Sequence, residues 1–186
     1  MIDYGRLDRS VKFYEERGFK RIETPWTVTK AVSAITKPPG KIDWEINGKN
    51  KVLVASGEQG FLYLALKGFL PKGRYQSITP CFREEIFDQT HTKYFMKNEL
   101  IITDEVNIDS LISIINTCKE FYEVELESKV EIVKTEQGYD LECCGIEIGS
   151  YGIRTCDYLD WIYATGLAEP RFTMVKNKIY RDGISY

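Results

Sequence analysis

The sequence predicts an α+β fold in which an antiparallel sheet is flanked by helices. Several strand patterns follow one another with no helix between them, which favours antiparallel pairing over a doubly wound sheet. Apolar residues make up 43% of the 186 residues, so a sizeable core is expected. Because no linker or low-complexity tract interrupts the chain, we expect a single domain over residues 1–186.

The first fifty residues predict a helix, a short strand and a loop. From Leu7 to Arg17 the apolar residues recur at helical spacing, and Gly18 follows as a helix stop. Phe19–Glu23 is a short strand pattern that ends before Pro25. Lys37–Asn50 contains Pro-Pro-Gly and Asn-Gly, which indicate a loop with a hairpin turn.

The middle of the chain predicts both strands and helices. Lys51–Ala55 reads as a short strand and Gln59–Leu70 as an apolar helix. Two longer strands are predicted over Tyr75–Glu85 and Tyr94–Thr103, with a loop between them. A second helix is expected from Asn107 to about residue 127, because its apolar residues lie on one side.

The last third predicts a group of strands and a final helix. The strand patterns are Val130–Lys134, Tyr139–Cys144, Ile146–Ile148 and Asp160–Thr165. The helix is expected over Arg171–Tyr180. These short strands complete the predicted antiparallel sheet.

Composition excludes several classes of function. The formal net charge is −3, so non-specific nucleic-acid binding is not predicted from charge. No apolar run reaches the roughly 18 residues of a membrane span, and the charged N-terminus does not resemble a signal peptide. Five cysteines without framework spacing favour reduced thiols in a cytoplasm, and a single histidine argues against a zinc site.

The run Phe82-Arg83-Glu84-Glu85, followed by His91 and Phe95, is the most informative segment. An arginine can hold phosphate oxygens in bidentate contacts, a carboxylate can accept from an exocyclic amine, and an aromatic ring can stack on a base. These groups on one strand–loop–strand segment suggest a nucleotide site. An ordinary charged hairpin is the alternative reading.

Two further segments carry candidate ligand groups. Asp140 and Glu147 are placed on neighbouring predicted strands, where they can share a hard cation such as magnesium. Small residues in Ala164–Ala168 leave room for a flat ligand, and Arg171 opens a helix where it can clamp a phosphate. Each segment alone also fits an ordinary hairpin or a strand-to-helix turn.

Taken in order, these segments resemble the catalytic core of class II aminoacyl-tRNA synthetases. The region from residue 6 to residue 35 resembles motif 1, residues 82–99 resemble motif 2, and residues 164–171 have the register of motif 3. Residues 139–154 look like the aspartyl, asparaginyl and lysyl subclass and are also similar to ammonia-dependent asparagine synthetase. Residues 54–59 resemble the loop that contacts the amino acid. The resemblance implies the same α+β catalytic domain without an anticodon-binding domain.

Carried over by position, the resemblance implies an ATP site. Arg83 corresponds to the arginine at the α-phosphate and Arg171 to the arginine over the γ-phosphate, and these two are the expected catalytic residues. Glu85 corresponds to the residue that meets the adenine amino group. Phe95 corresponds to the aromatic that stacks on adenine, and His91 to a group that reaches the outer phosphates.

The resemblance also implies a metal and an amino-acid site. Asp140 and Glu147 correspond to magnesium ligands, so ATP and Mg²⁺ are the expected cofactors. Ser56, Glu58 and Glu99 would face the amino acid, where a carboxylate pairs with its ammonium group.

Arg154 and Lys97 bear on which amino acid is bound. Arg154 corresponds to the arginine that reads a substrate carboxylate. Lys97 shares a strand face with Glu99 and would add positive charge to the pocket. Both observations favour aspartate or asparagine as the substrate. In the competing reading, Arg154 pairs with Asp157 or Asp160 and Lys97 pairs with Glu99, which leaves the choice open.

The expected activity is ATP- and magnesium-dependent formation of an aminoacyl-adenylate, with transfer to a tRNA, a protein or a small amine. The partners implied are a second copy bound through residues 7–35 and, for one acceptor, a tRNA end. An amide ligase similar to asparagine synthetase and an inactive core that serves as a binding module stay open. The departures that favour the module are Thr90, Ala164, Ala168 and Pro170, and the two alanine methyl groups are expected to crowd the adenine.

Overall fold

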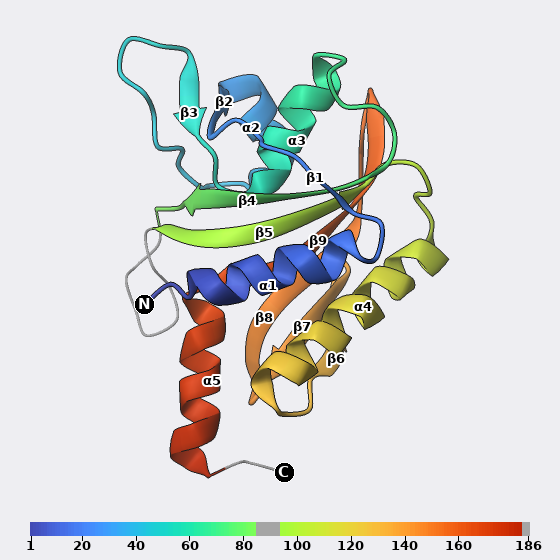
Figure 1. The fold of residues 1–186 in the computed structure, drawn as a ribbon. Coiled ribbons are helices and arrows are strands. Elements are labelled where there is room, and N and C mark those ends of the chain that lie inside the picture. Colours follow the sequence, from blue (N-terminus) through green and yellow to red (C-terminus); the bar gives the residue numbers. More distant parts are fainter. Residues whose placement is uncertain (85–93, 184–186) are drawn as a thin grey trace.

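A sheet of seven strands forms the centre of the computed structural model, which describes residues 1–84 and 94–183 (Figure 1). Its strands are β1 (Lys20–Arg21), β4 (Arg74–Phe82), β5 (Tyr94–Ile102), β6 (Glu131–Lys134), β7 (Tyr139–Cys143), β8 (Ile146–Cys156) and β9 (Leu159–Glu169). The strand order is β1-β4-β5-β9-β8-β7-β6, in which β1 and β4 are parallel and the other neighbours are antiparallel. The predicted α+β fold with a mainly antiparallel sheet is therefore confirmed.

Helices cover both faces of the sheet (Figure 1). One face carries α1 (Tyr4–Glu15), α4 (Ile108–Leu126) and α5 (Arg171–Asp182). The other face carries α2 (Lys30–Thr36), α3 (Gly57–Leu66) and a two-stranded sheet of β2 (Thr27–Thr29) and β3 (Lys51–Leu53). Each face has its own apolar core. Leu100 and Ile102 of β5 enter the first core and Ile101 enters the second, as strand alternation requires.

Polar side chains fix where the helices begin. The Asp3 carboxylate accepts a hydrogen bond from the Arg6 backbone N–H at 2.9 Å and caps α1. The Asn107 side chain caps α4 in the same way, at 2.8 Å from the N–H of Ser110. The predicted helix from Asn107 is thus confirmed, with Asn107 as its N-cap.

The hairpin turn predicted within Lys37–Asn50 is also present. The N–H of Ile46 donates to the carbonyl of Lys51 at 3.0 Å, and Glu45 forms a bridge with Val52. Gly48, in the turn between them, has a positive φ of 72°.

Two strands are longer than predicted, because their glycines do not end them. The strand pattern from Ile146 stops at Gly149 in the sequence, yet β8 continues to Cys156. A Cβ at Gly149 would lie 2.5 Å from the Tyr151 hydroxyl, and one at Gly152 would lie 2.7 Å from the Tyr163 ring. These glycines allow tyrosine side chains of β8 and β9 to pack closely against the strand. Likewise, β9 continues beyond the predicted Thr165 as far as Glu169.

The short elements β2 and α2 were not predicted from the sequence. Thr29 ends β2 and caps α2, since its hydroxyl oxygen accepts from the N–H of Val32 at 3.3 Å. The apolar residues of α2 are too few to show a helical period over seven residues. In the described part of the chain, no helix is both long and apolar enough to cross a membrane.

Candidate active site

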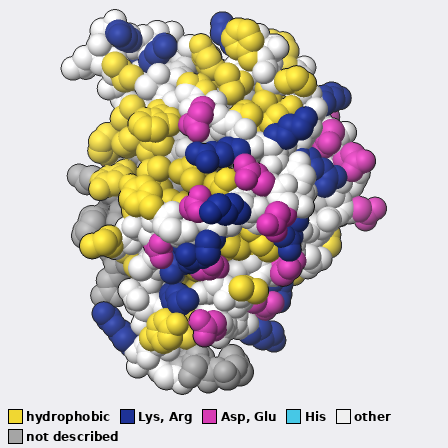
Figure 2. Space-filling view, in the orientation of Figure 1, with side chains coloured by type: hydrophobic (Ala, Val, Ile, Leu, Met, Phe, Trp, Pro, Cys, Tyr) yellow, Lys and Arg dark blue, Asp and Glu magenta, His cyan; other side chains and the backbone are white. Residues whose placement is uncertain are grey.

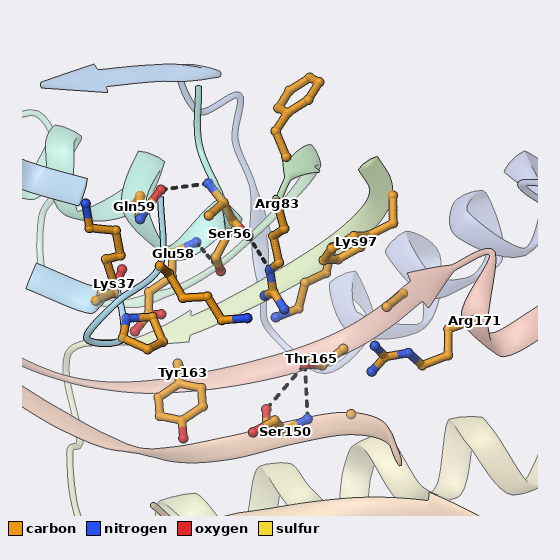
Figure 3. A pocket seen from close by; sticks show the side chains of 18 of the residues that line it. Lys37, Ser56, Glu58, Gln59, Arg83, Lys97, Ser150, Tyr163, Thr165 and Arg171 are labelled. Carbon is orange, nitrogen blue, oxygen red and sulfur yellow. Dashed lines mark hydrogen bonds between the residues drawn. The ribbon is translucent and has the colours of Figure 1, made fainter. Parts of the chain in front are cut away.

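A cavity of about 310 Å³ opens on the face of the sheet that carries α2 and α3. Figure 3 shows side chains from β4, β5, β8, β9 and the start of α3 converging on it. Many of the candidate site residues line this cavity: Ser56, Glu58, Arg83, Phe95, Lys97, Glu147, Arg154 and Arg171. Glu99 is buried beside Ser56, and Asp140 lies next to Ser150. Glu85 and His91 lie outside the described residues.

The outer end of the pocket holds two arginines that come from different elements. Arg83 follows β4, and its guanidinium carbon lies 5.0 Å from the centre of the Phe95 ring on β5. Its Nε donates to the Ala55 carbonyl at 3.0 Å. Arg171 opens α5, and its Nη1 lies 3.3 Å from a carboxylate oxygen of Glu147. Figure 3 shows the Arg83 and Arg171 side chains both directed toward the middle of the cavity.

The inner end begins with a buried carboxylate on β5. The Ser56 hydroxyl donates to Glu99 Oε2 at 2.6 Å, and Lys97 Nζ lies 2.8 Å from Glu99 Oε1. This distance confirms the alternative in which Lys97 and Glu99 form an ion pair. Glu99 Oε1 nevertheless accepts no well-aligned hydrogen bond. Glu99 Oε1 keeps the capacity to accept a bond from an entering ammonium group.

A second buried carboxylate, Glu58, is held by two donors. Arg154 Nη1 donates to Glu58 Oε2 at 2.5 Å, and the indole N–H of Trp161 donates to Oε1 at 2.6 Å. Burial raises the pKa of Glu58, Arg154 opposes that rise, and the nearby Glu99 adds to it. The expectation that Arg154 pairs with Asp157 or Asp160 is wrong, because its partner is Glu58, and Asp160 bonds with Thr155.

The chain brings these inner groups together through strand register. Arg154 on β8 is paired with Trp161 on β9, so both point at the start of α3, where Glu58 lies. The guanidinium carbon of Arg154 also sits 4.1 Å from the centre of the Tyr163 ring. At Gly57, before Glu58, a Cβ would come within 2.8 Å of the Glu99 Cβ, so only glycine permits this approach.

Asp140 and Glu147, the predicted magnesium ligands, lie on the neighbouring strands β7 and β8. Asp140 is in register with Ser150, which lines the cavity with Glu147. Burial raises the pKa of Asp140, and the charge of Glu147 adds to this rise, so the two carboxylates interact electrostatically. Among the described residues, no cluster of three or more Asp, Glu, His or Cys side chains is arranged for a metal. A two-carboxylate site completed by phosphate oxygens and water suits magnesium.

The two alanines of the predicted motif 3 segment have different positions. Ala164 packs in the core under α1 and α4, so the expectation that its methyl group crowds a ligand is wrong. Ala168 lines the cavity, and the expectation stands there. Between them, Gly166 is the extra residue at the bulge in the β5–β9 pairing.

Sequence reasoning missed part of the wall of the cavity. Lys37 lines it from the loop after α2 and pairs with Asp43 at 2.5 Å. Thr165 joins β9 to β8, since its hydroxyl accepts from the Ser150 N–H at 3.2 Å (Figure 3). Pro38, Pro39 and Gly40 marked a loop, but nothing in the local sequence placed that loop over the cavity.

Comparisons with known proteins bear on this site. Residues 61–180 match the model of a family described as the tRNA synthetases class II core domain (F). The pyrrolysyl-tRNA synthetase of Desulfitobacterium hafniense has a similar fold, with a TM-score of 0.75 and 16% identity, over 94% of this chain and 69% of that chain. The seryl-tRNA synthetase of Pyrococcus horikoshii complexed with ATP has a TM-score of 0.71 and 15% identity, over 91% of this chain and 49% of that chain. A search of curated proteins finds no match.

Proposed function

This chain belongs to the family of class II tRNA synthetase core domains, and on that premise we propose that it activates an amino acid with ATP. The resemblance read from the motifs is confirmed at the level of the class, and the aspartyl, asparaginyl and lysyl subclass stays a prediction. The observation that carries the proposal is a single cavity with Arg83, Phe95 and Arg171 at one end and Ser56 and Lys97 at the other, where both contact the buried Glu99.

The reaction follows from the charges in this cavity. The amino-acid carboxylate attacks the α-phosphorus of ATP, the bond to the β-phosphate oxygen breaks, and pyrophosphate leaves with the electron pair. Arg83 would neutralise charge at the α-phosphate, and Arg171 would bind the outer phosphates. No protein nucleophile is needed, because positioning and charge neutralisation suffice. Mg²⁺ held by Asp140 and Glu147 would add positive charge at the phosphates.

The substrate side of the proposal rests on the inner end. The ammonium group of the amino acid would bind Glu99 Oε1 beside Ser56, with Lys97 and Glu58 completing the wall. Arg154 would contact the side chain, and aspartate or asparagine is the proposed substrate. The acceptor of the activated amino acid is proposed to be a tRNA end, a protein or a small amine.

Amino-acid-dependent exchange of pyrophosphate into ATP tests the activity across the twenty amino acids. Exchange that requires one amino acid and magnesium, and that is lost in Arg83→Ala, supports the proposal. The matched control is Arg74→Ala, whose partners Asp104 and Glu105 lie outside the cavity. If the protein binds ATP but no amino acid supports exchange, it is a nucleotide-binding module and not an amino-acid-activating enzyme.

A homodimer through residues 7–35 is proposed as the assembly. Trp26 lies in this region and is 55% exposed. Figure 2 shows hydrophobic side chains gathered on the side of the molecule where β2 and β3 lie. Burying such a surface in a second copy would remove apolar area from water.

Light scattering is expected to give about twice the 21.6 kDa chain mass. Trp26→Glu should shift the mass toward that of one chain, whereas Tyr158→Glu, at another exposed aromatic outside the region, should leave it unchanged. A single-chain mass for the unaltered protein at micromolar concentration, with ATP activity intact, would contradict this assembly.

A further inference from the structure

Arg6 on α1 is charged but only 6% exposed, and it lies outside the cavity. Its Nη1 donates to a carboxylate oxygen of Glu169 and, at 2.8 Å, to the hydroxyl of Thr173. Its guanidinium carbon lies 5.2 Å from the centre of the Phe172 ring. One guanidinium therefore touches the last residue of β9 and two residues in the first turn of α5.

These contacts surround Arg171 in the sequence. Glu169 precedes Arg171 by two residues and Thr173 follows it by two, and the Thr173 N–H donates to Glu169 Oε2 at 3.2 Å. Phe172 is fully buried against the core, so the side of α5 next to Arg6 is fixed. Arg171 is directed toward the cavity, which Glu169 and Pro170 also line (Figure 3). Figure 1 shows α5 starting beneath the N-terminal end of α1, where Arg6 lies.

Arg6 is in turn held on the side away from Glu169. Its Nε donates to Glu125 Oε2 on α4 at 3.2 Å, and Nη2 lies 3.3 Å from Asp3. The planar guanidinium uses its donors in fixed directions, so it orients all of these partners at once. Lysine has no such fork and cannot reproduce the arrangement with one ammonium group.

We propose that Arg6 is a positioning residue for the ATP site: it fixes the junction of β9 and α5 and thereby the place of the Arg171 guanidinium over the outer phosphates. This inference rests on the proposed function. Misplacing a binding group by about 1 Å can cost up to roughly a hundredfold in rate, so a change at Arg6 should be measurable in the pocket.

The alternative is that Arg6 only stabilises the packing of α1. The two roles differ in what they do to ligands. If Arg6 positions Arg171, substitution of Arg6 lowers the affinity for ATP, which carries the outer phosphates. The affinity for AMP, which lacks them, does not change. A purely structural role lowers the melting temperature and leaves both affinities unchanged in the folded protein.

The test uses calorimetric titration of the full chain with ATP and with AMP, in magnesium. Arg6→Met should lower the affinity for ATP about tenfold and change the affinity for AMP by less than about twofold. Arg6→Lys should recover part of the loss. Thr173→Val removes the hydroxyl that accepts from Arg6 but leaves the Arg6–Glu169 charge pair in place, so the variant should fold and bind ATP about threefold more weakly.

The matched control is Arg9→Met, which removes an exposed pair with the same Glu125 but has no contact with Glu169. It should bind ATP like the unaltered protein. Equal ATP affinity in Arg6→Met, Thr173→Val and Arg9→Met would overturn the positioning role, as would equal weakening of ATP and AMP. Failure of the unaltered protein to bind ATP would instead overturn the proposed function itself.

Discussion

At the outer end of the cavity, Arg171 and Glu147 meet at 3.3 Å with 24% and 46% of their side chains exposed. At the inner end, Arg154 and Glu58 meet at 2.5 Å with 31% and 5% exposed, and Lys97 and Glu99 meet at 2.8 Å with 10% and 1% exposed. An exposed pair contributes little and exchanges partners cheaply. Buried charges must be paired before a ligand arrives, because an isolated charge in the interior is costly.

This difference in the exposure of the ion pairs suggests how a ligand would bind at each end of the cavity. Outer arginines can turn to a phosphate at small cost in stability. Inner charges form two neutral pairs, so an amino acid must exchange with a partner already present. Substitutions at the outer end should therefore act on binding, and substitutions at the inner end should also act on folding.

Glu58→Ala is expected to have the largest effect on stability. It leaves the Arg154 guanidinium and the Trp161 N–H without their acceptor, and breaking such a pair costs about 2–4 kcal/mol. Urea unfolding measures the change. The matched control is Glu45→Ala, which removes the exposed pair with Lys30 and should cost less than about 1 kcal/mol. Similar losses in the two variants would erase the contrast between buried and exposed pairs.

Arg171→Ala should do the reverse at the outer end. A charge-assisted contact is worth about 1.5–3 kcal/mol, so ATP affinity should fall roughly ten- to a hundredfold. The free energy of unfolding should change by less than about 1 kcal/mol, because the pair with Glu147 is exposed. Arg83→Ala should weaken ATP by a similar factor. If calorimetry finds unchanged ATP affinity in both variants, the nucleotide does not bind at the outer end of the cavity.

The pH dependence of stability should separate Glu58 from an outside carboxylate. Burial raises the pKa of Glu58 above its ordinary 4.5, so its stabilising contribution is full below pH 4.5 and is lost as pH rises through the folded-state pKa. Relative to Glu58→Gln, which does not titrate, the unaltered protein should lose stability over that rise.

Glu125 provides the control of opposite sign. Its hydrogen bond from Arg9 lowers the pKa of Glu125, so its contribution is present above pH 4.5 and is lost as pH falls through the folded-state pKa. Relative to Glu125→Gln, the unaltered protein should therefore gain stability as pH rises. Unfolding curves recorded over about 5 pH units, from roughly pH 3 to pH 8, measure both slopes. Parallel slopes for the two carboxylates would contradict the assignment of Glu58 as a desolvated group.

The sequence predicted the outer end more completely than the inner end. Arg83 directly follows β4, Phe95 lies on the neighbouring antiparallel strand β5, and Arg171 follows a strand-to-helix turn marked by Pro170. Lys97 and Glu99 are two residues apart on one strand, so their pairing was one of the two alternatives that alternation allowed.

The partner of Arg154 was not predictable in this way. Glu58 is 96 residues away in the sequence, and the two meet only because β8 and β9 pair in a particular register. That register depends on a long β8, whose internal glycines looked like a strand end. Arg6 and Glu169 are 163 residues apart, and their contact likewise depends on how α1 packs over the sheet.

The smallest expected effect concerns the choice between asparagine and aspartate. Lys97 with Glu99 and Arg154 with Glu58 already balance, so a neutral side-chain amide fits without adding charge, whereas a carboxylate adds an unpaired negative group. In the presence of ATP and magnesium, asparagine should raise the melting temperature more than aspartate, because it should bind about fivefold, or 1 kcal/mol, more tightly.

Two variants test this explanation. Glu58→Gln frees Arg154 from its anion while keeping an acceptor for Trp161, so the order of the two amino acids should reverse. Arg154→Leu should remove both shifts. Stabilisation by lysine or by an apolar amino acid would show that Arg154 does not read the substrate side chain, and an unchanged order in Glu58→Gln would show that the inner pairs do not set the choice.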